Sequence, residues 1–364
     1  MCAAGALFLV VHLASALFAG NVPVASSASR PVAAFGLYDG TTTKPDALDA
    51  DFDGNVKYAM DFQDGTSWST ITQSGYPYSS WRGTGYSMVW GIPMLPNSYS
   101  PNPSLSDPDG SCYGLTQEAN GAFDAAFTKV AEALDASGFG ASVIRLGWEF
   151  NLNWVPWSAD GCATAFVGAY RQIVTSMQLV PGVDFKFEWS PSLGDQGVGN
   201  LADYYPGRAF VRYVGLDVYD VGWGTYRGAQ AEFDMLRTRA YGLDWLSSFA
   251  ASVQKPIVLP EWGLGWGACD GGLAVVAPGE ETCGGDDATF VNDMAAWIRA
   301  NNVVEDTFWD YGTSTLAGCP NACTPIGPSA GDANTIADGN IKSFDALVAD
   351  FGRTSSTRSA ARSG

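Results

Sequence analysis

Eight apolar, strand-like runs recur along the 364-residue chain, and this repetition constrains the fold more than any other feature of the sequence. The runs cover residues 32–37, 56–62, 86–92, 141–147, 184–189, 213–218, 256–260 and 305–310. Helical periodicity separates them at 119–137, 163–178 and 289–301, more weakly at 229–252, and again near 341–351. Continuous apolar strands that alternate with helices favour a parallel sheet. Eight of them favour a closed (β/α)8 barrel of the TIM type, an α/β fold.

The connections after the predicted strands indicate where a site would lie. Segments 93–114 and 263–285 are long and rich in Gly, Pro and aromatic residues. In a barrel such loops share the face that carries the chemistry. A doubly wound open sheet is the alternative, but no Gly-x-Gly-x-x-Gly stands at a strand-to-helix turn, so a dinucleotide site has no support. We predict one catalytic domain at 31–352, with no repeats or linker, and a disordered Ser- and Arg-rich tail at 353–364.

Residues 1–28 are typical of a secretory signal peptide. Residues 7–18 are mostly apolar, no acidic residue precedes Asp39, and small residues near Ala25 and Ala28 offer cleavage sites. No Lys or Arg precedes the apolar run, so a short N-terminal anchor is the alternative. No other segment approaches the roughly 20 apolar residues of a membrane span. We therefore expect a secreted protein with long, disulfide-bearing loops and no membrane partner after signal removal.

Removal of the signal peptide would take away Cys2 and also His12, the only histidine of the chain. A Ser-His-Asp triad, a Cys-His pair and a His-ligated zinc site would then be excluded, so carboxylates must carry any acid–base chemistry. An even number of cysteines in an exported chain suggests disulfides, although the sequence alone does not settle their pairing. Sequence proximity favours the pairs Cys269–Cys283 and Cys319–Cys323, which leaves Cys112–Cys162.

The charge balance is strongly acidic, because 19 Lys and Arg stand against 38 Asp and Glu and give a formal net charge of −19. Such a field repels phosphate backbones and argues against nucleic acid as a partner. A neutral polymer is compatible with it.

The stretch 142–157 changes character abruptly from an apolar strand to a polar and aromatic strip. The strip holds Arg145, Trp148, Glu149, Asn151, Asn153, Trp154 and Trp157. Indole faces stack on sugar rings and amides bond sugar hydroxyls, so this strip is suited to line a sugar-sized cleft. We expect its arginine, its indoles and Asn151 to contact substrate.

Two glutamates are the candidates for the chemistry. Glu149 ends the fourth predicted strand and Glu261 the seventh, positions that face each other across a barrel mouth. A pair of carboxyl groups about 5–5.5 Å apart is what double-displacement glycoside hydrolysis requires. The proton donor needs an apolar or negative neighbourhood, which Trp148, Trp154 and Glu261 could give Glu149. Either glutamate alone could be a solvated or salt-bridged carboxylate, but together they favour catalysis.

Other polar and aromatic residues near predicted strand ends have two interpretations each. Arg145 is either a structural residue of the barrel interior or a partner of a catalytic carboxylate. Tyr219 either packs or bonds the nucleophile. Three further indoles are either core residues or sugar platforms: Trp189, Trp262 and Trp309.

A metal-dependent hydrolase that uses only carboxylates is a further alternative, because several acidic residues lie near strand ends. They are Asp61, Asp64, Asp217 and Asp220. We expect these to be solvated or hydrogen-bonded, with no catalytic metal and no cofactor, although a structural calcium in the acidic loop 270–287 stays open.

Three motifs stand in order along the chain. The first is Arg145-x-x-Trp148-Glu149-Phe150-Asn151 followed by Trp154-Val-Pro-Trp157. The second is Tyr205-Pro206-Gly207 leading to Val214-Gly215-Leu216-Asp217-Val218-Tyr219. The third runs from Lys255-Pro256 to Glu261-Trp262-Gly263. Together they resemble the motifs of glycoside hydrolase family 26, the clan A family of β-mannanases and related β-glucanases and β-xylanases. The resemblance spans roughly residues 35–351.

This resemblance implies a role for each matching residue. Glu149 would be the acid/base, Glu261 the nucleophile and Tyr219 its hydrogen-bond partner, while Trp154 and Trp189 would line the subsite beside the cleaved bond. One departure is Trp148, which stands where the family's mannanases usually have histidine. The expected enzyme is a secreted, monomeric, retaining endo-β-glycosidase acting on β-mannan or mixed-linkage β-glucan. The alternatives are a non-catalytic carbohydrate-binding barrel and a clan A-like hydrolase of xylan or a microbial cell-wall glycan.

Overall fold

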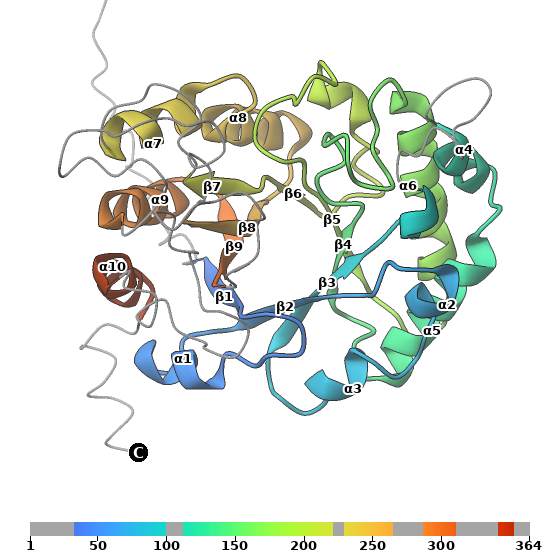
Figure 1. Ribbon diagram of the computed structural model, residues 1–364, viewed down its shortest axis with the longest axis horizontal. Helices are drawn as coiled ribbons and strands as arrows, with labels where there is room; N and C mark the ends of the chain where they lie inside the picture. The colour runs from blue at the N-terminus through green and yellow to red at the C-terminus, as the bar shows by residue number, and fades with distance from the viewer. Residues whose placement is uncertain (1–32, 100–111, 221–228, 265–286, 311–340, 353–364) are drawn as a thin grey trace, which may run out of the picture. The chain divides into compact units, whose positions relative to one another are not determined.

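The computed structural model describes residues 33–99, 112–220, 229–264, 287–310 and 341–352 (Figure 1). Several sequence-based predictions lie outside these residues: the signal peptide at 1–28, the tail at 353–364, most of the acidic loop, and the cysteine pairs Cys269–Cys283 and Cys319–Cys323. No helix in the described ranges is long and apolar enough to cross a membrane.

The predicted (β/α)8 barrel is confirmed. Its parallel strands are β1 (Ala34–Tyr38), β2 (Tyr58–Phe62), β3 (Ser87–Ile92), β4 (Val143–Leu146), β5 (Lys186–Trp189), β6 (Tyr213–Gly215), β7 (Val218–Asp220), β8 (Ile257–Leu264) and β9 (Val303–Trp309). They pair in the order β6-β5-β4-β3-β2-β1-β9-β8-β7, and an additional pairing of β6 with β8 closes the ring. Since β6 and β7 both pair with β8, they form one barrel strand interrupted at Leu216 and Asp217.

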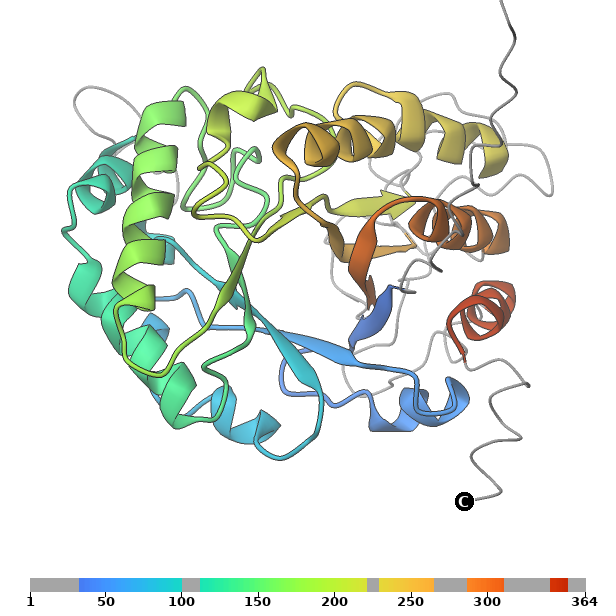
Figure 2. The same ribbon diagram turned by 180° about the vertical axis from the view of Figure 1, so that it is seen from behind.

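Helices surround the ring of strands (Figures 1 and 2). They are α1 (Asp46–Asp51), α2 (Trp68–Ile71), α3 (Tyr78–Trp81), α4 (Tyr113–Ala119), α5 (Asp124–Ala136), α6 (Ala163–Gln178), α7 (Ala229–Thr238), α8 (Leu243–Val253), α9 (Ala288–Ala300) and α10 (Ile341–Phe351), with 3-10 turns η1 (Asn97–Tyr99) and η2 (Leu201–Tyr204). Their apolar faces and the outward side chains of the strands form the main hydrophobic core.

One predicted helix starts later than expected, and another is divided in the structure. The expected helix at 119–137 begins only at Asp124, because residues 120–123 form a turn around Gly121, whose φ of 81° lies in the left-handed region that favours glycine. The expected helix at 229–252 breaks before Gly242, where a β-carbon would collide with the backbone carbonyl oxygens of Leu236 and Arg237. This break divides it into α7 and α8.

The seventh barrel strand is longer than predicted. The expected run ends at residue 260, whereas β8 continues to Leu264 because β7 pairs with its last residues, Val218 with Trp262 and Asp220 with Leu264. Glu261 therefore lies within a strand rather than after one. The register with β9 shifts between Leu259 and Trp262, next to this glutamate.

A second, smaller apolar cluster fills the barrel interior. Tyr38, Met60, Val89 and Val143 come from four neighbouring strands and are buried against one another. Val143 and Arg145 are two residues apart on β4, so their side chains share the inward face of the sheet. The apolar cluster is thus the lower layer of the interior, and a charged layer begins at Arg145.

Candidate active site

Glu149 lies in a tight turn directly after β4. Its φ is 50°, a left-handed conformation that is uncommon for residues other than glycine, and its backbone N–H donates to the Ser190 carbonyl at 2.9 Å. Gly147, with a φ of 58°, comes two residues earlier, and a β-carbon there would collide with Met94. The sequence Gly-Trp-Glu therefore bends the chain sharply at the strand end, a strained arrangement that is common at functional sites.

Glu261 is held at both carboxylate oxygens. The Arg145 guanidinium donates to Oε2 at 2.5 Å, and the Tyr219 hydroxyl donates to Oε1 at 2.5 Å. Glu261 is 7% exposed, so it is largely enclosed but still reachable. Two donors fix the plane of this carboxylate.

Arg145 is the hub of the charged layer and is fully buried. Its guanidinium contacts three carboxylates, those of Glu261, of Asp217, and of Glu188 at 3.4 Å from Nε. Burial disfavours the arginine's charge, but attraction by Asp217, Glu261 and Glu188 outweighs burial and raises the pKa of Arg145 further above its usual range. One permanent cation thus organises acidic residues from several barrel strands.

Glu149 is suited to hold a proton. Burial, and then the negative charge of Glu261, raises the pKa of Glu149 to about 7, while Arg145 and a hydrogen bond with Ser192 act in the opposite direction. The mutual influence of the two glutamates means that they share one electrostatic environment, although they are 112 positions apart in the sequence (261 − 149). The site therefore pairs a carboxylate with a group that is protonated through the mildly acidic range.

Aromatic side chains border the charged layer. Trp148 packs between Phe62 and Trp157, with ring centroids 5.0 Å and 4.5 Å away. The Arg145 guanidinium lies 5.8 Å from the Trp148 ring and 5.9 Å from the Phe62 ring. On the other side Trp309 lies 6.5 Å from the Tyr219 ring. These contacts form an apolar border of the kind that stacks against sugar rings.

Two residues that were predicted to contact substrate form hydrogen bonds with backbone groups of the protein. Asn151 is completely buried, donates to the carbonyls of Ser192 and Gly194, and accepts from the Ser192 N–H. The Trp157 indole donates to the Trp148 carbonyl at 2.7 Å and is 4% exposed. Both residues position the loops around Glu149.

Trp189 and Trp262 point away from Glu149 and Glu261, and the Trp262 indole donates to Asp306 at 3.2 Å. Side chains alternate along a strand, so the inward direction of Glu188 and Glu261 turns the next residue toward the helices. Trp189 packs against Phe249 of α8, and Trp262 packs against Phe290 of α9 and Phe351 of α10. Both indoles are at most 1% exposed. Trp154, by contrast, is 62% exposed after β4, where a ligand could reach it.

Three residues of the site were not among those predicted to act there. Glu188 contacts Arg145, Phe62 packs against Trp148, and Ser192 forms a hydrogen bond with Glu149. Phe62 ends a predicted strand and could have been found by that signal alone. Glu188 is hidden in the sequence, because a single acidic residue within an apolar strand does not reveal which partner it meets.

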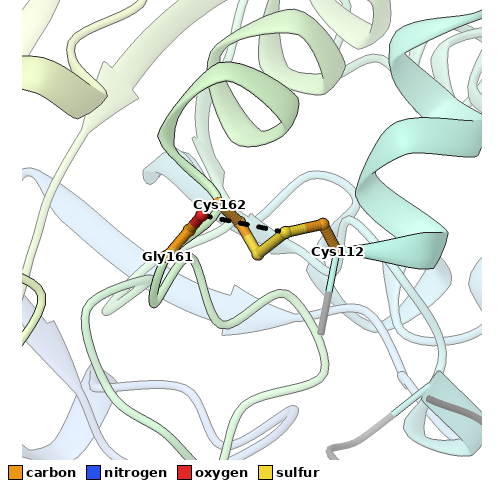
Figure 3. The surroundings of a disulfide bond; sticks show 3 residues. All are labelled: Cys112, Gly161 and Cys162. Carbon is orange, nitrogen blue, oxygen red and sulfur yellow. Dashed lines mark hydrogen bonds between the residues drawn. A yellow bond between two sulfur atoms is a disulfide. The ribbon is translucent and has the colours of Figure 1, made fainter. Parts of the chain in front are cut away.

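The predicted disulfide Cys112–Cys162 is present, with 5.5 Å between the two α-carbons. Figure 3 shows it joining the starts of α4 and α6, with the Gly161 carbonyl 4.0 Å from the Cys112 sulfur. It ties the loop after β3 to the loop after β4, so it stiffens the wall that carries Trp154 and Trp157.

A cavity of about 480 Å³ lies at the opposite end of the barrel. It is lined where β2 to β6 begin, by residues that include Tyr58, Ser87, Val143, Lys186 and Tyr213. No group of three or more His, Cys, Asp and Glu side chains in the described ranges is arranged to hold a metal ion. The carboxylates around Arg145 are not among the residues that line this cavity.

Solved structures show which known proteins share this arrangement of strands. GH26C from Muricauda sp. MAR_2010_75 matches with a TM-score of 0.52 and 16% identity, over 85% of each chain. A GH26 beta-mannanase from Bacteroides ovatus gives 0.51 and 14%, over 87% of this chain and 88% of that one. The chain has the fold of these glycoside hydrolases. The GH53 catalytic domain of Ignisphaera aggregans gives 0.51 and 13%, over 86% of this chain and 96% of its own.

At the level of fold, the resemblance to family 26 that the motifs indicated is confirmed, and family 53 shares the same barrel. No family model matches the chain. The search of curated proteins also found no match.

Proposed function

We propose that this protein is a retaining glycoside hydrolase that cleaves an uncharged β-glycan, with Glu261 as nucleophile and Glu149 as acid/base. The arrangement around Glu261 is the observation that carries the proposal. One carboxylate, that of Glu261, is held by Arg145 and Tyr219. Burial, and then the charge of this carboxylate, raises the pKa of Glu149 to about 7. Two carboxyl groups in opposite protonation states are what double displacement requires.

In the first step Glu261 attacks the anomeric carbon while Glu149 gives its proton to the glycosidic oxygen. The bond between that oxygen and the anomeric carbon breaks, so the leaving sugar departs with a new hydroxyl and a glycosyl ester forms on Glu261. In the second step the ionised Glu149 takes a proton from water, which attacks the same carbon and releases Glu261. Two inversions restore the original configuration.

The substrate class follows from charge and from the aromatic border. A net charge of −19 disfavours anionic polymers, and the indoles of Trp148, Trp154 and Trp309 suit neutral pyranose rings. One of the solved structures with this fold is described as a beta-mannanase. We infer that the substrate is β-mannan or mixed-linkage β-glucan, cut within the chain. Mixed-linkage β-glucan stands beside β-mannan because Trp148 occupies the position where the family's mannanases usually have histidine.

The test compares the wild type with Glu261→Ala on β-mannan, mixed-linkage β-glucan and xylan. We expect the wild type to release oligosaccharides from at least one polymer and Glu261→Ala to lose on the order of 10⁴-fold or more in kcat, as for removal of a nucleophile. Glu118→Gln is the matched control, since Glu118 is a buried glutamate on α4 away from the site. Equal turnover by wild type and Glu261→Ala would contradict the proposal. Binding without turnover by the wild type would indicate a carbohydrate-binding barrel.

We further propose that the protein is secreted after removal of residues 1–28. The apolar run at 7–18 and the small residues after it support this. Expression in a secreting host, followed by N-terminal sequencing of the protein in the medium, should give a start at or near Ser29. Retention in the membrane fraction with residue 1 intact would favour the anchor instead.

A further inference from the structure

Glu188 is a buried carboxyl group that the proposed mechanism leaves without a role. It lies on β5, is 0% exposed, and its Oε1 is 3.4 Å from Nε of Arg145. Within the described ranges neither of its oxygens has a hydrogen-bond partner, and the same holds for Nε of Arg145. Arg145 Nε and Glu188 Oε1 are therefore each other's available partners, at a distance that a small movement would turn into a hydrogen bond.

The other donors of Arg145 are already committed. Nη1 donates to Glu261 and Nη2 to Asp217. A guanidinium is planar, so contacts at three of its edges fix both its position and its orientation. Of the three carboxylates around it, Asp217 and Glu188 have fully buried side chains, and Glu261 alone has exposed surface.

We propose that Glu188 is a positioning residue for the reaction: by engaging Nε it orients Arg145 so that Nη1 holds the Glu261 carboxylate in line for attack. This role rests on the proposed function. It acts only through Arg145, because the Glu188 side chain is completely buried and does not reach a substrate. Loss of the contact should misplace the nucleophile while leaving the binding surfaces of the cleft unchanged.

The protonation state of Glu188 determines which substitution preserves its contact with Arg145. Burial, opposed by Arg145 and assisted by Glu305 and Glu261, raises the pKa of Glu188 to about 8. Below neutral pH the group is therefore largely a neutral acid, whose carbonyl oxygen can accept from Nε. Glutamine has the same shape and the same acceptor, so Glu188→Gln should preserve the contact. Methionine has similar length but only a weak acceptor, so Glu188→Met should remove it.

The experiment measures kcat and KM for both variants at pH 6 on two substrates. One is the polysaccharide that the wild type cleaves, and the other is a dinitrophenyl β-glycoside of the same sugar, whose leaving group needs no proton from Glu149. Glu188→Met should lose about tenfold to a hundredfold in kcat with KM little changed, as misplacement of a reacting group does. The loss should be similar on both substrates, because the defect lies at Glu261. Glu188→Gln should restore kcat to near the wild-type value.

Glu118→Gln and Glu118→Met are the matched controls, because burial raises the pKa of Glu118 to about 8 as well, but on α4 outside the barrel. If Glu188→Met does not fold, Glu188→Asp replaces it, since the shorter side chain withdraws the acceptor from Nε. Three results would each overturn the role of Glu188. The first is an unchanged kcat in the folded Glu188→Met or Glu188→Asp variant, and the second is a defect seen only on the polysaccharide. The third is an equal loss of kcat in Glu188→Gln and Glu188→Met. Absence of β-glycan turnover by the wild type would instead overturn the proposed function, and this role with it.

Discussion

Glu149 shows how much a single residue depends on neighbours that the sequence does not place beside it. The flanking indoles suggested an apolar setting, but the structure adds a left-handed backbone, the Ser190 carbonyl and the charge of Glu261. Trp189 and Trp262 show that residues adjacent in sequence can be separated in space. Both residues lie beside a chemically important glutamate in the sequence and face the opposite way in space, because alternation along a strand separates neighbours.

The proton on Glu149 sets the alkaline limit of activity. Because its pKa is raised to about 7, the acid form is present below that pH and is lost as the pH rises through it. We expect kcat/KM on the polysaccharide to fall about tenfold for each pH unit above about 7. A pH–rate profile from pH 4 to 9 measures this.

The control is the dinitrophenyl glycoside in the first turnover, whose cleavage needs no proton donor and should show no such decline. A value of kcat/KM on the polysaccharide that stays constant up to pH 9 would show that Glu149 is not the proton donor.

At the scale of elements, the sequence predicted the number and order of barrel strands, because apolar runs separated by helical periods have few other solutions. The helix α6 was predicted at its observed bounds. Two features were missed because they depend on long-range pairing. The extension of β8 to Leu264 requires β7 beside it, and the split of the sixth strand at Leu216 and Asp217 frees Asp217 to meet Arg145.

The disulfide between the loops after β3 and β4 should contribute measurably to stability. It closes a segment of 50 residues, for which the loss of unfolded-state entropy corresponds to about 4 kcal/mol as an upper value. We expect Cys112→Ser with Cys162→Ser to lower the free energy of unfolding by about 2–4 kcal/mol, measured by urea titration at neutral pH.

Reduction of the wild type with dithiothreitol should give a similar loss, which separates the bond from the substituted side chains. An unchanged unfolding midpoint in both cases would show that this crosslink does not stabilise the barrel.

Acidic residues outnumber basic ones over the whole chain, 38 against 19, and several acidic side chains are buried in the barrel. Within the described ranges, Arg145 is the buried cation that contacts acidic side chains in the barrel. Burial raises the pKa values of Glu188, Glu305 and Asp306 to about 8. The folded state therefore binds protons that the unfolded chain would release near its ordinary carboxyl pKa values. A negative net charge adds self-repulsion as these groups ionise.

Stability should consequently decline with rising pH. Between about pH 4.5 and pH 8 the native state binds more protons than the unfolded state, so the slope of the unfolding free energy against pH is negative. Urea titrations at pH 5, 7 and 9 should give progressively lower midpoints. Glu305→Gln should weaken this dependence, because it removes one buried ionisable group. A maximum of stability at pH 9 would contradict the assignment of these carboxyls as protonated.

The central claim is that Glu261 forms a covalent bond to the sugar while Glu149 serves the other side of the same linkage. The most direct measurement is to trap that bond with a 2-deoxy-2-fluoro glycoside of the cleaved sugar and to map the label by peptide mass spectrometry. The account predicts one added glycosyl group on Glu261 and slower labelling when Arg145 is changed to Lys. A label on any other residue, or none on a protein that actively hydrolyses its polysaccharide, would contradict it.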